Sequence, residues 1–280
     1  MENNLFKKAC RTLELDKVLA MLAEQCVCDD AKQMARDIEP KTELGEVQAQ
    51  ISETTAAKLM LLRRSAPSFR GVVNIISSVG RAAAGSTLSA RELINVGNVL
   101  ATARGLIAYQ ENGIEMETCI DGLFASLSAN SYLENRIFDA IVGEDEIADN
   151  ASAELASIRR KIAATNQKIR DTLHKIVHSQ QYQKVLQDSL FTIRSGRFVV
   201  PVKAESRGEL PGIVHGSSSS GATLFIEPMP VVEANNEISV LFDKEKEEIE
   251  RILAELSAET ANFAESIDII SLQIKFLVIY

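Results

Sequence analysis

Basic side chains are concentrated in the middle of this acidic chain. Residues 155–207 carry 11 Lys and Arg against 3 Asp and Glu, whereas the rest of the chain carries 19 against 36. Lysine and arginine neutralise phosphate groups and release their counterions, which gives affinity that falls with salt and has no base preference. The chemistry that this distribution indicates is contact with the backbone of a nucleic acid.

The candidate phosphate contacts form one group on an expected helix and a second group between residues 194 and 220. Glycine and serine residues at 216–221 add backbone amides and hydroxyls that donate to phosphate oxygens. The candidate residues are Lys168, Lys175, Arg194, Arg197, Lys203, Arg207, Ser217, Ser218, Ser219 and Ser220.

Two alternatives to phosphate binding stay open. The basic residues of the helix also match acidic residues later in the chain, which an antiparallel helix pair would bring together as internal ion pairs. Those acidic residues are Glu247, Glu248, Glu250 and Glu255. The serine run is also typical of a mobile loop.

Three motifs resemble catalytic or metal sites, and each lacks a required group. The stretch at 80–87 has the glycine spacing of a phosphate-binding loop, but Ser86 stands where Lys is required, which favours a small-residue loop before a helix. His174 and His178 have no third ligand nearby, and His215 has no paired nucleophile. The four cysteines are interpreted as reduced thiols. We expect no catalytic residue, no metal site, no cofactor and no enzyme activity in this chain itself.

The first 150 residues have the pattern of packed helical hairpins. Aromatic residues make up only 5% of the chain and Trp is absent, which favours a mainly α fold. Apolar spacing predicts a helix over 12–38, stopped by Pro40, and another over 42–64. Ser89 and Glu92 have the spacing of a capping box, so a helix is expected to begin there and run towards Tyr109, with a turn at 113–117. We predict one helical core domain over 1–150.

Two long apolar stripes with helical spacing follow, through 155–176 and through 241–277. Each stripe is narrow and flanked by charges, so the two are expected to bury each other as an antiparallel pair within one chain, or to pair between chains. We expect an ascending coiled-coil arm over 151–189 and a returning arm over 234–280. About 40 helical residues span roughly 60 Å, so the joining segment is displayed far from the base of this lever.

The joining segment, 190–233, changes to alternating and β-branched residues that are typical of strands. Residues 191–194 and 198–202 flank a tight turn, and residues 212–215 and 222–226 flank a looser, serine-rich turn. Pro201 has no amide hydrogen for a strand ladder, so its strand is expected at an edge or a bulge. We predict a small antiparallel β clamp at the tip of the lever.

The order of three segments in this region is distinctive. They read RFVVPVK at 197–203, PGIVH at 211–215 and SGATLFIEP at 220–228. Together with TLELDK at 12–17 and the pairing of Leu88-Ser89 with Glu92-Leu93, they resemble the second branch of the MutS family, and the resemblance covers essentially the whole chain.

The resemblance implies a homodimeric, DNA mismatch-repair-like ATPase. Its whole form is expected to carry a helical core, a coiled-coil lever with a clamp, a domain that uses ATP and Mg²⁺, and a carboxy-terminal endonuclease domain. The implied partners are branched or duplex DNA, in restraining recombination, or the ribosomal RNA of collided ribosomes. The chain stops inside its second apolar stripe, so we expect it to be the amino-terminal part, cut before the ATPase.

Two further expectations concern location and an alternative role. The start of the chain has no secretory signal, and no run of 18 apolar residues predicts a membrane span, so a cytoplasmic protein without membrane partners is expected. The alternative function is a coiled-coil module for dimerisation or ribosome docking that makes no direct contact with DNA.

Overall fold

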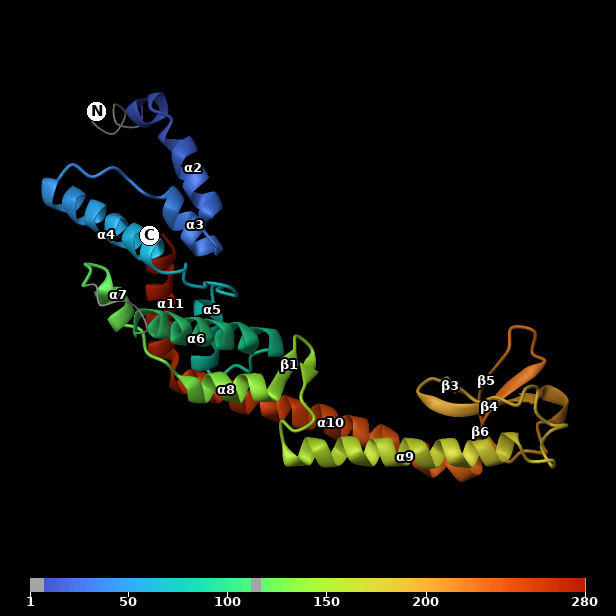
Figure 1. Cartoon of the computed structure of the whole chain (residues 1–280). Coiled ribbons are helices and arrows are strands. Elements are labelled where there is room, and N and C mark those ends of the chain that lie inside the picture. Colours follow the sequence, from blue (N-terminus) through green and yellow to red (C-terminus); the bar gives the residue numbers. More distant parts are fainter. Residues whose placement is uncertain (1–7, 112–116, 280) are drawn as a thin grey trace. The chain divides into compact units, whose positions relative to one another are not determined.

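The computed structural model describes residues 8–111 and 117–279 (Figure 1). It is mainly helical with small antiparallel sheets, which confirms the expected class. The chain divides into two compact units, unit 1 formed by Met1–Ala148 and Ile252–Tyr280, and unit 2 formed by Asp149–Arg251. A turn is expected at 113–117, and residues 113–116 of it lie outside the described residues.

Unit 1 is a bundle of helices with a short two-stranded sheet. Its elements are α2 (Leu15–Gln25), α3 (Asp29–Arg36), α4 (Leu44–Arg63), α5 (Ile76–Ala83), α6 (Ala90–Glu111), α7 (Asp121–Ala125), α8 (Ser131–Ala140), β1 (Ile141–Gly143), β2 (Glu146–Ile147) and α11 (Ala264–Ile279). Helix α6 packs against α8, and α11 packs against α3, α5, α6 and α7. The fully buried side chains on these helices include Leu93, Leu100, Leu133, Ile137, Ile267, Ile270 and Ile274.

The helix predicted over 12–38 is wrong in two places, because it is interrupted at Leu13 and Glu14, where Glu14 has φ 56°, and again at residues 26–28. Cys26 and Cys28 have extended backbone angles, and α3 begins after them with Asp29 and Asp30 in its first turn. Acidic side chains are favoured there by the positive end of the helix dipole. Both thiols are buried, so packing holds the break in place.

Local signals for helix ends in unit 1 are confirmed. The backbone N–H of Ser89 donates to Glu92 Oε2 (3.1 Å) and the N–H of Glu92 donates to Ser89 Oγ (3.4 Å), which is the capping box at the start of α6. The stretch at 80–87 ends α5 instead of forming a phosphate loop. Gly85 has φ 86°, and the 85→82 and 86→81 backbone hydrogen bonds around it form a Schellman motif.

Unit 2 consists of a helix pair and a four-stranded antiparallel sheet. Its elements are α9 (Ala153–Val177), β3 (Thr192–Arg194), β4 (Arg197–Lys203), the 3₁₀ turn η1 (Ala204–Ser206), β5 (Gly212–Ser217), β6 (Thr223–Pro228) and the part of α10 (Met229–Asn262) that lies before residue 252. The strand order is β3-β4-β6-β5. Both predicted hairpins are confirmed, because β3 pairs with β4 and β5 pairs with β6.

The two helices of unit 2 run antiparallel and are joined at both ends. Near the start of α9, Ser152 Oγ donates to Glu248 Oε1 (2.5 Å) and Arg159 Nε donates to Glu245 Oε1 (2.7 Å). Towards the other end, both helices contribute to one core beneath the sheet (Figure 1). This core includes Ile169, Leu173 and Ile176 of α9, Val231, Ala234 and Ile238 of α10, and Phe198, Val200, Val202 and Ile226 of the sheet.

The helices differ in length from the arms predicted for them. Helix α9 ends at Val177 instead of near residue 189, so its 25 residues span roughly 37 Å. The chain leaves the helix because Val185 and Leu186 turn back into the core, where Leu186 forms a β-bridge with Val202. The second apolar stripe, predicted over 241–277, is divided between the two units. Its apolar residues beyond 251 are packed inside unit 1.

Pro201 lies inside a strand with neighbours on both sides, which corrects the expectation of an edge strand. Its partner in β6 is Phe225. On its other side β3 has already ended, since the last β3 pair joins Thr192 to Val199, and the Pro201 carbonyl accepts from Gln187 N–H (2.9 Å). The Pro201 nitrogen, which carries no hydrogen, therefore lies on the side where regular strand pairing has stopped.

Candidate nucleic-acid interface

Lys168 and Lys175 lie seven residues apart on α9, which puts them on the same side of the helix. Both side chains are exposed, and within the described residues neither has an ion-pair partner. Internal pairing instead engages Arg159, which contacts Glu245 on α10 and also Asp149. The two lysines remain open to a phosphate.

Glu248, one of the acidic residues proposed as a partner for the basic helix, binds Arg251 and Ser152 instead of a lysine of α9. Its carboxylate accepts from the Arg251 guanidinium through both oxygens (2.7 and 2.8 Å) and from the Ser152 hydroxyl. The hydrogen bonds from Arg251 lower the pKa of Glu248 to about 2, against the opposing effect of burial. This carboxylate is fixed on its own helix and does not neutralise Lys168 or Lys175.

Glu227 in β6 is a fully buried carboxylate at the centre of a polar network. Its Oε1 accepts from Arg197 Nη1 (2.9 Å) and Asn235 Nδ2 (2.7 Å), and its Oε2 lies 2.6 Å from His215 Nε2. Arg197 also donates to Asn236 Oδ1 (2.5 Å). These partners offset the cost of removing a charge from water.

The network changes the interpretation of Arg197, which sequence reasoning placed among the phosphate contacts. Its charge is already matched by Glu227, and its side chain is 28% exposed. Neither Glu227 nor Asn235 was predicted as a site residue. The sequence signal for this network is a glutamate between Ile226 and Pro228 in an apolar strand. A charge buried in such a strand requires partners, which indicates a polar network around it.

The other basic residues at the sheet have no carboxylate partner among the described residues. The Arg194 guanidinium carbon lies 4.4 Å from the centre of the Phe225 ring, a cation–π contact. Lys203 Nζ donates to the carbonyl of Lys184 (3.0 Å), and Arg207 is exposed just after η1. These three cations are left uncompensated at one end of unit 2.

The serine run forms a turn that is fixed by its own hydrogen bonds. Ser218 N–H donates to the Thr223 carbonyl (2.8 Å), Ser218 Oγ accepts from Thr223 N–H (3.1 Å), and Gly221 N–H donates to the Ser218 carbonyl (2.9 Å). Gly216 and Gly221 have φ 138° and 72°, values that favour glycine. The hydroxyl-bearing residues Ser217, Ser219 and Ser220 are exposed on this turn.

A polar cavity of about 580 Å³ lies between the β3–β4 turn and the serine turn. It is lined by Arg194, Ser195, His215, Gly216, Ser217, Ser218, Ser219 and Phe225. One uncompensated guanidinium and several hydroxyls face a space that no carboxylate lines, which suits an anion. This cavity brings together most of the predicted serine contacts and Arg194, whereas Lys168 and Lys175 lie on α9.

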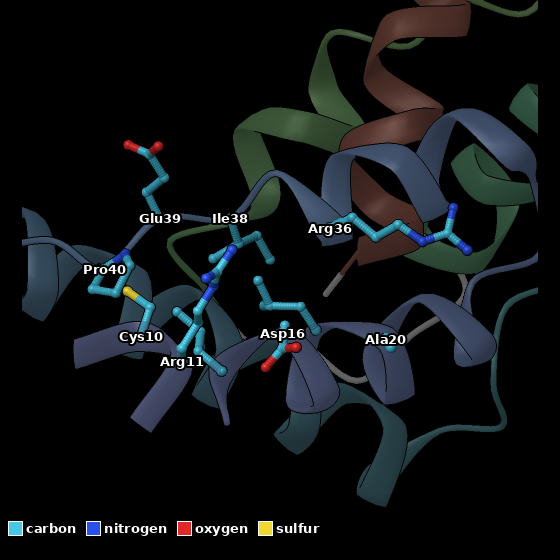
Figure 2. Close-up of a pocket in the computed structure, with 10 residues that line it drawn as sticks. Cys10, Arg11, Asp16, Ala20, Arg36, Ile38, Glu39 and Pro40 are labelled. Carbon is cyan, nitrogen blue, oxygen red and sulfur yellow. The ribbon is translucent and has the colours of Figure 1, made fainter. Parts of the chain in front are cut away.

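Unit 1 has a second sizeable cavity, of about 550 Å³, between α2 and the segment after α3. Figure 2 shows Arg11 and Asp16 on one side of it, Ile38 and Pro40 on the other, and the Arg36 side chain extending away from Arg11. Its charged groups do not converge on one point, as a specific small-molecule site requires. The arrangement of these groups does not indicate a binding site for a small molecule.

Within the described residues, no group of three or more His, Cys, Asp or Glu side chains is placed to hold a metal ion. His174 and His178 lie with their rings 5.5 Å apart, and His174 also contacts Phe191 edge-on. None of the described helices is long and apolar enough to cross a membrane.

Comparison with known proteins finds several relatives that carry the same name. No protein-family model matches the chain. Proteins named Endonuclease MutS2 are similar to it: 42% identical over 91% of the chain in Ruminiclostridium cellulolyticum, 40% over 93% in Acetivibrio thermocellus and 41% over 95% in Clostridioides difficile. The matched part is 32%, 33% and 34% of those proteins. The chain thus spans about a third of the length of the curated relatives it matches.

Proposed function

Since this chain belongs to the MutS2 family and spans about a third of its relatives' length, we propose that unit 2 is the nucleic-acid-contacting part of a MutS-type protein. Phosphate groups bind along α9 at Lys168 and Lys175 and at the sheet end through Arg194, Lys203, Arg207 and the serine turn. The observation that carries the proposal is that these cations are uncompensated within the described residues, although the chain as a whole has a net charge of −9.

An exposed cation without a carboxylate partner in its own chain is open to an external anion such as phosphate. Arg159 and Arg197 show that this chain matches a basic side chain with a carboxylate where the charge serves the fold. Lys168 and Lys175 are exposed on α9 without such a match. Lysines in this setting bind phosphates without breaking an internal ion pair, and the release of counterions from the phosphates adds to the affinity.

We propose that α9 and the first part of α10 act as a coiled-coil lever and that the sheet acts as a clamp at its end. Nucleotide binding with ATP and Mg²⁺, and endonuclease activity, are assigned to other parts of the whole protein. The stretch at 80–87 does not fit a nucleotide, because it ends a helix and has Ser86 in the position of the required lysine.

The proposed partners are duplex or branched DNA, or ribosomal RNA, bound by a homodimer of the whole protein. The test is fluorescence anisotropy of the chain with labelled duplex DNA, a four-way DNA junction and a ribosomal RNA fragment over a series of salt concentrations. We expect binding at low salt that weakens steeply as salt rises. Failure to bind any of the three at low salt would instead favour a dimerisation or docking module.

A further inference from the structure

The sheet of unit 2 has one face in the core and one face that carries an aromatic side chain with a cation on it. Phe198, Val200 and Val202 of β4 point into the core. Side chains alternate along a strand, so Pro201 and its partner Phe225 belong to the opposite face. Phe225 is only partly buried there, next to the polar cavity of about 580 Å³.

Arg194 covers the Phe225 ring without being held by any carboxylate among the described residues. Its guanidinium lies 4.4 Å above the ring centre, and the side chain is exposed. A guanidinium is planar and has two faces, so the face turned away from the phenyl ring is free to stack on a second ring. Both residues line the cavity, and its size lies within the range of about 300–1,000 Å³ that suits small ligand groups.

The opposite wall of the cavity offers hydrogen-bond donors at a fixed place. The serine turn presents the exposed hydroxyls of Ser217 and Ser219, and its backbone is held through Ser218 and Thr223. His215, at the start of this wall, is anchored to the buried carboxylate of Glu227. A stacking surface and a set of phosphate donors thus line one cavity.

We propose that this cavity takes one unpaired base of a single-stranded nucleic acid. The base stacks on the free plane of the Arg194 guanidinium, which itself rests on Phe225, and the adjoining phosphate binds the serine turn. Stacking of bases on aromatic rings and on arginine planes is how single strands are held without sequence preference. The inference rests on the proposed nucleic-acid contact and adds a substrate class, strands with unpaired bases.

The experiment compares a labelled oligothymidine strand of about 12 nucleotides with an abasic strand of the same length, by fluorescence anisotropy at low salt. The two strands carry the same phosphates, so their affinity ratio reports the bases alone. We expect the chain to prefer the normal strand by at least about 5-fold, the lower end for one stacked base. Arg194→Lys keeps the charge but removes the plane, so it abolishes the preference while the abasic strand still binds.

Two further variants complete the design. Phe225→Leu removes the ring beneath Arg194 and also abolishes the preference, whereas Arg70→Lys, on an exposed arginine of unit 1, leaves the ratio unchanged. Equal binding of normal and abasic strands, or an unchanged ratio in Arg194→Lys, would overturn the inference and leave phosphate binding intact. Absence of binding to both strands and to duplex DNA would overturn the proposed function as well.

Discussion

Arg197 and Glu227 form an ion pair across two neighbouring strands, with Arg197 Nη1 2.9 Å from Glu227 Oε1 and the carboxylate fully buried. The same carboxylate contacts His215, which begins the segment leading into the serine turn. Arg197 directly follows the Ser195-Gly196 turn. One buried charge therefore ties together the two turns that line the polar cavity.

Arg197→Ala is expected to destabilise the chain, because it leaves the buried Glu227 carboxylate without its guanidinium partner. The loss should be about 2–4 kcal/mol, below the full cost of breaking a buried pair because Asn235 and His215 remain. Urea unfolding followed by circular dichroism measures it. Arg207→Ala, on an exposed residue, serves as control and should change stability by no more than about 0.5 kcal/mol. Equal effects of the two variants would contradict a structural role for Arg197.

Removing the two lysines of α9 is expected to change the salt dependence of nucleic-acid binding. Each phosphate contact contributes about −0.9 to the slope of log K against log salt for duplex DNA, so Lys168→Ala/Lys175→Ala should make the slope less steep by up to about 2. Lys41→Ala/Lys58→Ala removes the same charge from unit 1 and should leave the slope nearly unchanged. The anisotropy titrations on duplex DNA give both slopes. Identical slopes in the two double variants would remove α9 from the interface.

Parts of the fold that depend on neighbouring residues are predictable from the sequence. The capping box of Ser89 and Glu92 requires only their spacing, and it forms as expected. The turn at Ser195 and Gly196 has positive φ at both residues, 49° and 75°, the conformation that matches the twist of a two-residue hairpin. Such signals act over a few residues, where no tertiary contact competes with them.

Parts that depend on residues far apart in the chain were not predictable. Glu227 meets partners 30, 12 and 8 residues away, and no spacing in the sequence connects them. The helix break at 26–28 contains neither glycine nor proline, so no local signal marks it. Burial of the two thiols holds the break in place. The end of α9 at Val177 depends on Val185 and Leu186, which pack beneath the sheet against residues from distant parts of the chain.

Stability is expected to fall in acid through Glu248. The Arg251 guanidinium holds its pKa at about 2, below the ordinary value of 4.5, and the carboxylate is 9% exposed. Its contribution is therefore complete above pH 4.5 and is lost as the pH falls from 4.5 towards 2. The amount is on the order of 2 kcal/mol, reduced from the full shift because Arg251 is half exposed.

The measurement for Glu248 is the urea midpoint of the wild type and of Glu248→Gln between pH 6 and pH 2.5. Asp30, Glu92 and Asp121 also have lowered pKa values, so the wild-type curve alone mixes several carboxylates. The difference between the two proteins isolates Glu248 and should shrink as the pH falls below 4.5. A constant difference across this range would contradict the assignment.

Alanine at Gly80 and at Gly85 is expected to have effects of opposite sign, because the two glycines occupy different places at the end of α5. Gly85 has φ 86° in the Schellman motif, so Gly85→Ala should destabilise by about 1 kcal/mol. Gly80 lies within the helix with no atom within 4 Å of an added Cβ, so Gly80→Ala should stabilise by about 0.5–1 kcal/mol. Thermal and urea unfolding of the two variants give the signs. If both glycines formed a phosphate-binding loop, both substitutions would disturb it alike, so effects of the same sign would count against the helix-end interpretation.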